Sequence, residues 1–166
     1  MIVRPESERD VPAIREVNLA AFRDHPFSQQ TEHLIVEALR AAGALEVSLV
    51  AEVDGGVVGH IAFSPGGIGD TTSGWYVLGP VAVLPAYQGE GIGRALVEAG
   101  LEALRSRGAS GCVLVGDPVF YTRFGFASNP GVTWPGVPQE NVVCILLAGE
   151  QPTGRVTYHE AFHAGT

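Results

Sequence analysis

LGPVAVLPAYQGEGIGRAL, residues 78–96, places an apolar strand, a glycine-rich turn and the start of a helix in direct succession. The strand pattern contains Gly79-Pro80, although glycine and proline both weaken a regular strand and are typical of bulges. It stops at Pro85, and three glycines then occur within five residues: Gly89, Gly91 and Gly93. We therefore expect an interrupted strand, followed by a turn whose main chain a ligand can approach closely.

The sequence around this stretch reads as a strand–helix–strand unit over residues 76–116. The helical pattern ends with two arginines before Gly108, which is typical of a helix C-terminus. The run GCVLVG, residues 111–116, then predicts a strand that is buried on both faces. Such a unit is expected to form a right-handed crossover between two parallel strands.

The rest of the chain alternates short helical and strand patterns, without an internal repeat or a linker. It predicts a single domain over residues 1–166, of α/β (α+β) class, with helices packed on a mixed sheet. The predicted elements outside the central unit are a strand at 1–5, helices starting near Asp10 and Thr31, strands at 46–53 and 57–63 around an Asp54-Gly55-Gly56 hairpin, a flexible loop at 64–74, and strands at 140–147 and 154–159.

Composition limits the class of protein. The 166 residues are 46% hydrophobic, which is enough for a sizeable core, yet no apolar run approaches the roughly 20 residues that span a bilayer. The N-terminal residues lack the features of a signal peptide. Cys112 and Cys144 both lie in apolar strand-like runs, which predicts reduced, buried thiols rather than a disulfide or a metal pair. We expect a cytoplasmic protein that is not bound to a membrane.

Charge narrows the possible ligands. The formal net charge of −8 disfavours nucleic acid as a partner, because a duplex-binding protein needs a positive face. All ten basic residues are arginine, which excludes the lysine of a phosphate-binding P-loop and a Schiff-base lysine. An anion can still bind where the first N–H groups of a helix lack partners. We expect a diphosphate at the main-chain amides of residues 89–94, with Arg94 beside it. The alternative is a glycine turn that only eases helix–sheet packing.

A dinucleotide site is a weaker alternative. Its G-x-G-x-x-G pattern needs a glycine or alanine at the last position. Counted from Gly89 that position is Arg94, and counted from Gly91 it is Leu96, so neither register completes the pattern.

Two motifs resemble those of the GNAT superfamily of N-acetyltransferases. Gln88, Gly91 and Gly93 form a Q-x-x-G-x-G motif directly after the strand that ends VAVLP. The run FYTRFGF, residues 120–126, is similar to the superfamily's aromatic segment, in which a tyrosine precedes a Gly-Phe pair. The order of elements matches over nearly the whole chain. The resemblance implies a mostly antiparallel central sheet with helices on both faces, in which the fourth and fifth strands are parallel and splay apart.

The resemblance also implies a ligand, acetyl-CoA, as the acyl donor. Its pantetheine arm would enter between the splayed strands and pair with main-chain groups, much as an added strand would. The cofactor-binding residues implied in this way are Val81, Ala82 and Val83 for pantetheine, and Gln88, Gly89, Glu90, Gly91, Ile92, Gly93 and Arg94 around the diphosphate.

The implied reaction is direct attack of a primary amine on the thioester, without an acyl-enzyme, so Cys112 needs no role. Tyr121 matches the superfamily's general-acid tyrosine, and its ordinary pKa of about 10 lets it donate a proton at neutral pH. The alternative for Tyr121 is a core aromatic. The general base is open: His60 is the first candidate, although a strand histidine is more often a satisfied core residue, and His25 and Glu46 are weaker ones.

One departure from the superfamily is Asp117, where many members carry an asparagine before the tyrosine. A rival function is a non-catalytic domain of the same fold that binds or senses acyl-CoA. Tyr121 favours the enzyme, because a sensor does not need that hydroxyl. The acceptor, a small-molecule or peptide amine, is not defined by the sequence, nor is the choice between monomer and homodimer. We predict no metal site.

Overall fold

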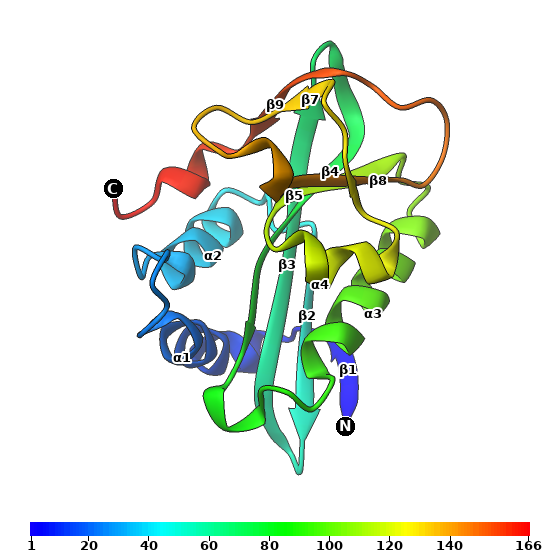
Figure 1. Cartoon of the computed structure of the whole chain (residues 1–166). Coiled ribbons are helices and arrows are strands. Elements are labelled where there is room, and N and C mark those ends of the chain that lie inside the picture. The colour runs from blue at the N-terminus through cyan, green and yellow to red at the C-terminus, as the bar shows by residue number, and fades with distance from the viewer.

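The computed structural model describes all residues, 1–166, as one twisted sheet with helices packed against it (Figure 1). The helices are α1 (Val11–Phe22), α2 (Glu32–Ala41), α3 (Ile92–Ser106) and α4 (Pro118–Tyr121), with short 3-10 turns η1 (Glu8–Asp10), η2 (Pro85–Tyr87), η3 (Thr122–Phe124), η4 (Gln139–Asn141) and η5 (Glu160–His163). The strands are β1 (Ile2–Pro5), β2 (Val47–Val53), β3 (Gly56–Ile68), β4 (Thr71–Val83), β5 (Gly111–Val115), β6 (Ala127–Ser128), β7 (Val132–Thr133), β8 (Val142–Leu146) and β9 (Gly154–Tyr158).

The sheet has the predicted mixed topology. Its main path runs β1-β2-β3-β4-β5-β8-β6, with β9 paired to β3 and β7 paired to β9. The pairs along that path are antiparallel except β4–β5, which is parallel and is connected through α3. This confirms the predicted crossover over residues 76–116. Because α3 bridges β4 and β5, its N-terminus lies beside the end of β4, where the glycine-rich turn begins.

The prediction of a flexible loop at residues 64–74 is wrong. β3 continues to Ile68 and β4 begins at Thr71, so the two strands form a long hairpin around Gly69 and Asp70. Its glycines are needed for close strand packing: a methyl group on Gly66 would lie 2.7 Å from Val77 Cγ2. β9 then pairs along the same segment of β3.

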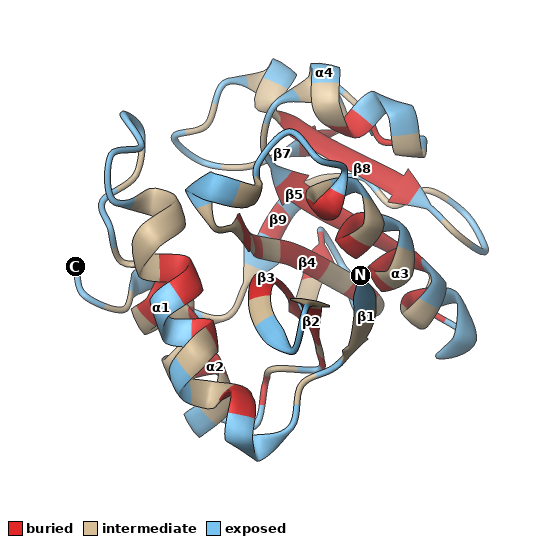
Figure 2. Cartoon of the chain, turned by 90° about the horizontal axis from the view of Figure 1, so that it is seen from below, coloured by how far each residue is buried: buried red, intermediate tan, exposed pale blue.

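Helices pack on opposite faces of the sheet over apolar clusters of buried side chains (Figure 2). On one face α3 packs so closely that a methyl group on Gly100 would lie 2.4 Å from the Phe63 ring. On the other face α1 and α2 pack on β2 through Ile14, Val36 and Val50. Both cysteines are free and buried, as predicted. None of the helices is long and apolar enough to cross a membrane.

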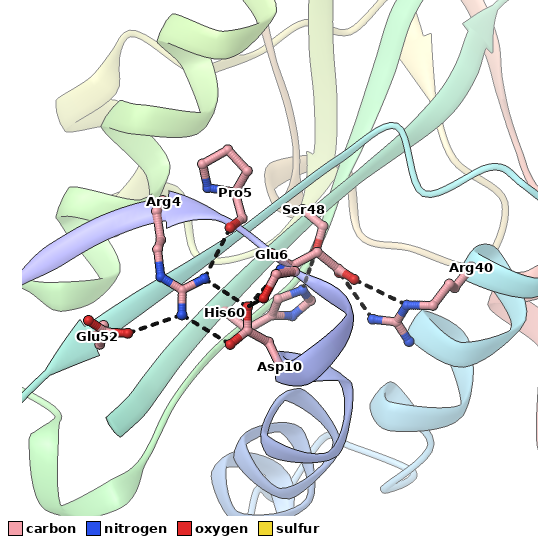
Figure 3. A network of polar contacts seen from close by, with 9 residues as sticks. Arg4, Pro5, Glu6, Asp10, Arg40, Ser48, Glu52 and His60 are labelled. Carbon is pink, nitrogen blue, oxygen red and sulfur yellow. Dashed lines mark hydrogen bonds and ion pairs between the residues drawn. The ribbon is translucent and has the colours of Figure 1, made fainter. Parts of the chain in front are cut away.

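A polar network links η1 to β1 and β2 at the edge of the sheet (Figure 3). The Asp10 carboxylate is 4% exposed and accepts two hydrogen bonds from the Arg4 guanidinium, at 2.7 and 3.0 Å. It also accepts from the main-chain N–H of Ser7 at 2.7 Å, and Arg4 donates further to Glu52 at 3.0 Å. The Arg4 guanidinium holds the pKa of Asp10 well below its usual range.

We expect Asp10→Ala to lower the free energy of unfolding by about 1–2 kcal/mol, because a capping carboxylate bonded to an arginine is lost. The folded pKa of Asp10 is below the unfolded value of about 3.9, so its contribution is complete above about pH 4. It disappears as the pH falls further toward the folded pKa. Urea unfolding of both proteins at pH 7 and pH 3 measures this, and the difference between them should shrink at pH 3. Glu37→Ala is the control, since it breaks the more exposed pair with Arg15 and should cost less than about 1 kcal/mol.

Candidate functional site

The fourth and fifth strands separate as predicted, and the space between their unpaired ends is called the slot below. Only residues Trp75–Val77 of β4 pair with β5, opposite Gly111–Val113. β4 continues for six more residues, to Val83. Beyond the last pair, Gly79-Pro80 forms a bulge opposite Ala62 on β3, and Gly79 has a φ of +146°. The bulge lets β4 stay attached to β3 while it leaves β5. Val115, at the end of β5, is 45% exposed at this opening.

Register decides which main-chain groups of β4 face the slot. The Leu84 N–H donates to the Val58 carbonyl at 2.8 Å, and Ala82 lies opposite His60 two residues earlier. Hydrogen-bonded pairs alternate along an antiparallel ladder, so Ala82 directs its N–H and C=O toward β3. Ala82 therefore has no free main-chain group with which to bind pantetheine, contrary to the prediction. Val81 and Val83 direct their groups toward the slot.

The glycine-rich turn forms an open cradle of donors. Gly89 and Gly91 have φ values of +80° and +83°, and a methyl group on either would have no atom within 4 Å. None of the main-chain N–H groups of residues 89–94 donates a hydrogen bond within the protein. The Gln88 side chain donates to the Val83 carbonyl at 3.0 Å, which ties the turn to the end of β4. Arg94 is exposed and forms an ion pair with Glu98.

The three predicted parts of the site meet at Gly93, on the first turn of α3. A methyl group there would lie 3.9 Å from Phe120 Cζ and 4.0 Å from Val83 Cγ2. Phe120 belongs to α4 and Val83 ends β4, so the aromatic segment, the glycine turn and the splayed strand border one space. Sequence spacing alone could not place the aromatic segment there.

Tyr121 is 7% exposed and packs among Phe120, Phe124 and Phe126, with ring centroids 4.9–6.4 Å away. Its hydroxyl makes no hydrogen bond within the protein. Burial raises the pKa of Tyr121 above its usual range, and nearby Cys112 and Asp117 act in the same direction. The hydroxyl is therefore protonated at neutral pH, but it is a weaker acid than the ordinary tyrosine assumed from the sequence. Asp117 itself caps α4 by accepting the Val119 N–H at 2.9 Å.

His60 lies on β3, opposite Ala82, but its ring is 0% exposed beneath α1. Ser48 donates to Glu6, so Ser48 Oγ accepts from His60 Nε2 at 2.8 Å (Figure 3). Asn18 Nδ2 is 3.4 Å from Nδ1, and Arg40 donates to Glu6. Burial, together with the charge of Arg40, lowers the pKa of His60 to about 3. These contacts favour the alternative of a satisfied core histidine.

The weaker base candidates are Glu46 and His25. Glu46 pairs with Arg107 at 2.7 Å, just beyond the C-terminal end of α3. α3 has 15 residues, so this pair lies about 22 Å from the glycine turn. His25 is in the α1–α2 connection, where its ring contacts Phe22 and the 92% exposed Phe27.

Two surface cavities, of about 340 and 580 Å³, lie against β1 and β2 rather than at the slot. The smaller is bordered by Glu6, Arg40 and Ser48, and the larger by Arg4, Glu52 and their neighbours. No group of three or more His, Cys, Asp or Glu side chains is placed to hold a metal ion.

Comparison with known proteins agrees with this fold. Residues 44–128 match the family model described as an acetyltransferase (GNAT) domain. The chain is 36% identical over 170 residues to the uncharacterized N-acetyltransferase YhbS of Escherichia coli, which covers 98% of this chain and 99% of YhbS.

Two solved structures superpose on nearly the whole fold. A GNAT family acetyltransferase from Brucella melitensis, solved with acetyl-CoA, has a TM-score of 0.87, 51% identity and 97% coverage of both chains. Escherichia coli YhbS, solved with CoA, has a TM-score of 0.85 and 33% identity, covering 99% of this chain and 93% of that one. The mixed sheet with its splayed parallel pair is the fold of an acyltransferase. The chain belongs to the GNAT family of acetyltransferases.

Proposed function

We propose that residues 1–166 form one N-acetyltransferase domain, which moves the acetyl group of acetyl-CoA to a primary amine by direct attack. The observation that carries this proposal is the convergence at Gly93 of the unpartnered amides, the β4 edge and the aromatic segment. The Brucella melitensis relative was solved with acetyl-CoA and YhbS with CoA, which supports the same acyl donor here.

The chain's own groups suit that donor. The amides of residues 89–94 have no hydrogen-bond partner within the protein, as a diphosphate site requires, and each such contact at a helix N-terminus contributes on the order of 0.3–1 kcal/mol. A protein of net charge −8 needs such local donors to bind a polyanion. Val81 offers its main-chain N–H and C=O to the pantetheine amides. Val83 offers its N–H, because its carbonyl already accepts from Gln88. Gln88 acts indirectly, by fixing the turn to Val83.

Tyr121 then protonates the departing sulfur. The neutral amine attacks the thioester carbonyl, the C–S bond breaks, and the sulfur takes the proton of the Tyr121 hydroxyl. The amine nitrogen loses its own proton to water, which later reprotonates the tyrosine. Cys112 takes no part, because complete burial raises the pKa of its thiol and keeps it neutral. His60 is outside this mechanism, since its ring is closed off from the slot by α1.

Binding is tested by thermal unfolding. Acetyl-CoA or CoA at a hundred times its Kd should stabilise the fold by about 2.7 kcal/mol, which raises Tm by about 5–10 °C for a chain of this size. NADH should leave Tm unchanged. A rise with NADH and none with CoA would contradict the proposal.

Turnover is tested by following free thiol released from acetyl-CoA across a panel of small-molecule and peptide amines. The chain has no lysine, so none of its own side-chain amines competes as an acceptor. Amine-dependent thiol release is expected for at least one acceptor class. Tight CoA binding with no release above the hydrolysis rate, for any amine of the panel, would favour a binding domain instead.

A further inference from the structure

The β5–α4 junction contains a glycine, Gly116, at a position where the backbone conformation does not require glycine. The φ angle of Gly116 is not positive, so a side chain there would not strain the backbone. A methyl group at Gly116 would instead lie 2.6 Å from Cε2 of Tyr121 and 2.9 Å from Leu114 Cδ1. Cε2 is bonded to the carbon that carries the hydroxyl. The tyrosine ring therefore rests directly on the Gly116 main chain, at its reactive end.

α4 cannot orient this ring alone. The helix has only four residues, and one turn of helix is marginal without outside support. The hydroxyl of Tyr121 makes no hydrogen bond within the protein. Its position is therefore set by ring packing and by the main chain beneath the ring.

Asn141 holds that main chain from the other side. The Gly116 N–H donates to the Asn141 carbonyl at 2.9 Å, and Asn141 Nδ2 donates back to the Gly116 carbonyl at 3.1 Å. The Asn141 N–H itself is used in η4, where it donates to the Pro138 carbonyl at 3.0 Å. The side-chain amide thus replaces the missing main-chain donor and extends the β5–β8 ladder by one pair beyond Val115 and Val142.

We propose that Asn141 is a positioning residue for Tyr121: by clamping Gly116 it places the tyrosine hydroxyl at the slot. The proposal rests on the general-acid role of Tyr121 given above. Removal of the amide donor frees the Gly116 carbonyl, and the main chain under the ring can then move. Misplacement of a reacting group by about 1 Å costs up to about a hundred-fold in rate.

Asn141→Asp is the test, because it keeps the side-chain shape and removes the donor. We expect kcat at saturating amine to fall about ten- to a hundred-fold, with CoA affinity unchanged. In a Tyr121→Phe background the same substitution should change kcat less than about two-fold, because the group that it positions is already gone. An equal loss in both backgrounds would overturn the proposal.

Gln151→Glu is the matched control. Gln151 also donates one side-chain amide hydrogen bond to a main-chain carbonyl, that of Pro152 at 2.9 Å, beyond the other end of β8. The substitution makes the same change of amide to acid without touching Gly116. It should leave kcat unchanged.

Ring signals separate this proposal from the proposed function. The chain has four tyrosines, so NMR spectra of protein labelled with ¹³C in the tyrosine rings are simple, and Tyr121→Phe assigns the Tyr121 signals. Asn141→Asp should shift the Tyr121 signals, and Gln151→Glu should not. Unmoved signals would reject the placement of the ring by Asn141. Shifted signals with unchanged kcat would instead reject Tyr121 as the general acid. They would then also reject a role for Asn141 in positioning that acid.

Gly116→Ala provides a second route to the same contact. Its methyl group would meet the ring 2.6 Å from Cε2 and must displace it. We expect shifted Tyr121 signals and a loss of kcat similar to that of Asn141→Asp, without a change in CoA affinity. Unmoved Tyr121 signals in this variant would show that the ring does not depend on the Gly116 main chain.

Discussion

Tyr121→Phe should lower kcat at saturating amine by about a hundred- to ten-thousand-fold and leave CoA affinity almost unchanged. The ring remains, so its packing against Phe120, Phe124 and Phe126 survives and only the hydroxyl is lost. The hydroxyl makes no hydrogen bond within the protein, so its loss leaves no buried partner unsatisfied. The fold should therefore be as stable as that of the wild type.

The measurement is kcat from pH 6 to 9, with the acceptor amine identified beforehand. Burial raises the pKa of Tyr121 above its usual range, so the hydroxyl stays protonated over this whole interval. Wild-type kcat should accordingly show no loss from tyrosine ionisation up to pH 9. A Tyr121→Phe enzyme within threefold of wild type across the range would remove Tyr121 from the mechanism.

Gly93→Glu should weaken CoA binding by about a hundred- to thousand-fold. Two unit charges of like sign at 4 Å repel by about 4 kcal/mol near a protein surface, and each 1.4 kcal/mol is tenfold in affinity. Gly93 is the suitable position, because its φ is not positive and a Cβ would meet its neighbours at ordinary contact distances. Gly91 is not, since its φ of +83° strains any side chain.

Calorimetric titration with CoA measures the loss, and circular dichroism checks the fold. Gly93→Gln is the control of equal size without the charge, so the difference between the two variants isolates the electrostatic part. We expect the glutamine variant to bind CoA at least tenfold more tightly than the glutamate variant. Wild-type affinity in Gly93→Glu would mean that the diphosphate binds away from this turn.

Local sequence patterns predict most of the fold. The helix after the glycines, the Asp54-Gly55 hairpin and the crossover of residues 76–116 are visible in the sequence because each depends on neighbours in the chain. The interruption at Gly79-Pro80 likewise predicted a departure from the ladder, and the structure has a bulge there. Residues 64–74 form strands instead of the predicted loop, because their glycines serve packing against strands distant in the chain.

The sequence by itself therefore determined the order of the longer elements, the glycine turn at a helix start and the tyrosine after β5, but not the short strands β6 and β7. Only the tertiary structure decided which groups serve the slot. Pairing with β3 turns the main-chain groups of Val81 and Val83 toward the slot and those of Ala82 away. Packing beneath α1 closes off His60, which strand alternation alone left as a candidate base. Asn141 and Gly116 are 25 residues apart in the chain and meet through the β5–β8 ladder. Strand register sets this contact, so local sequence propensity cannot predict it.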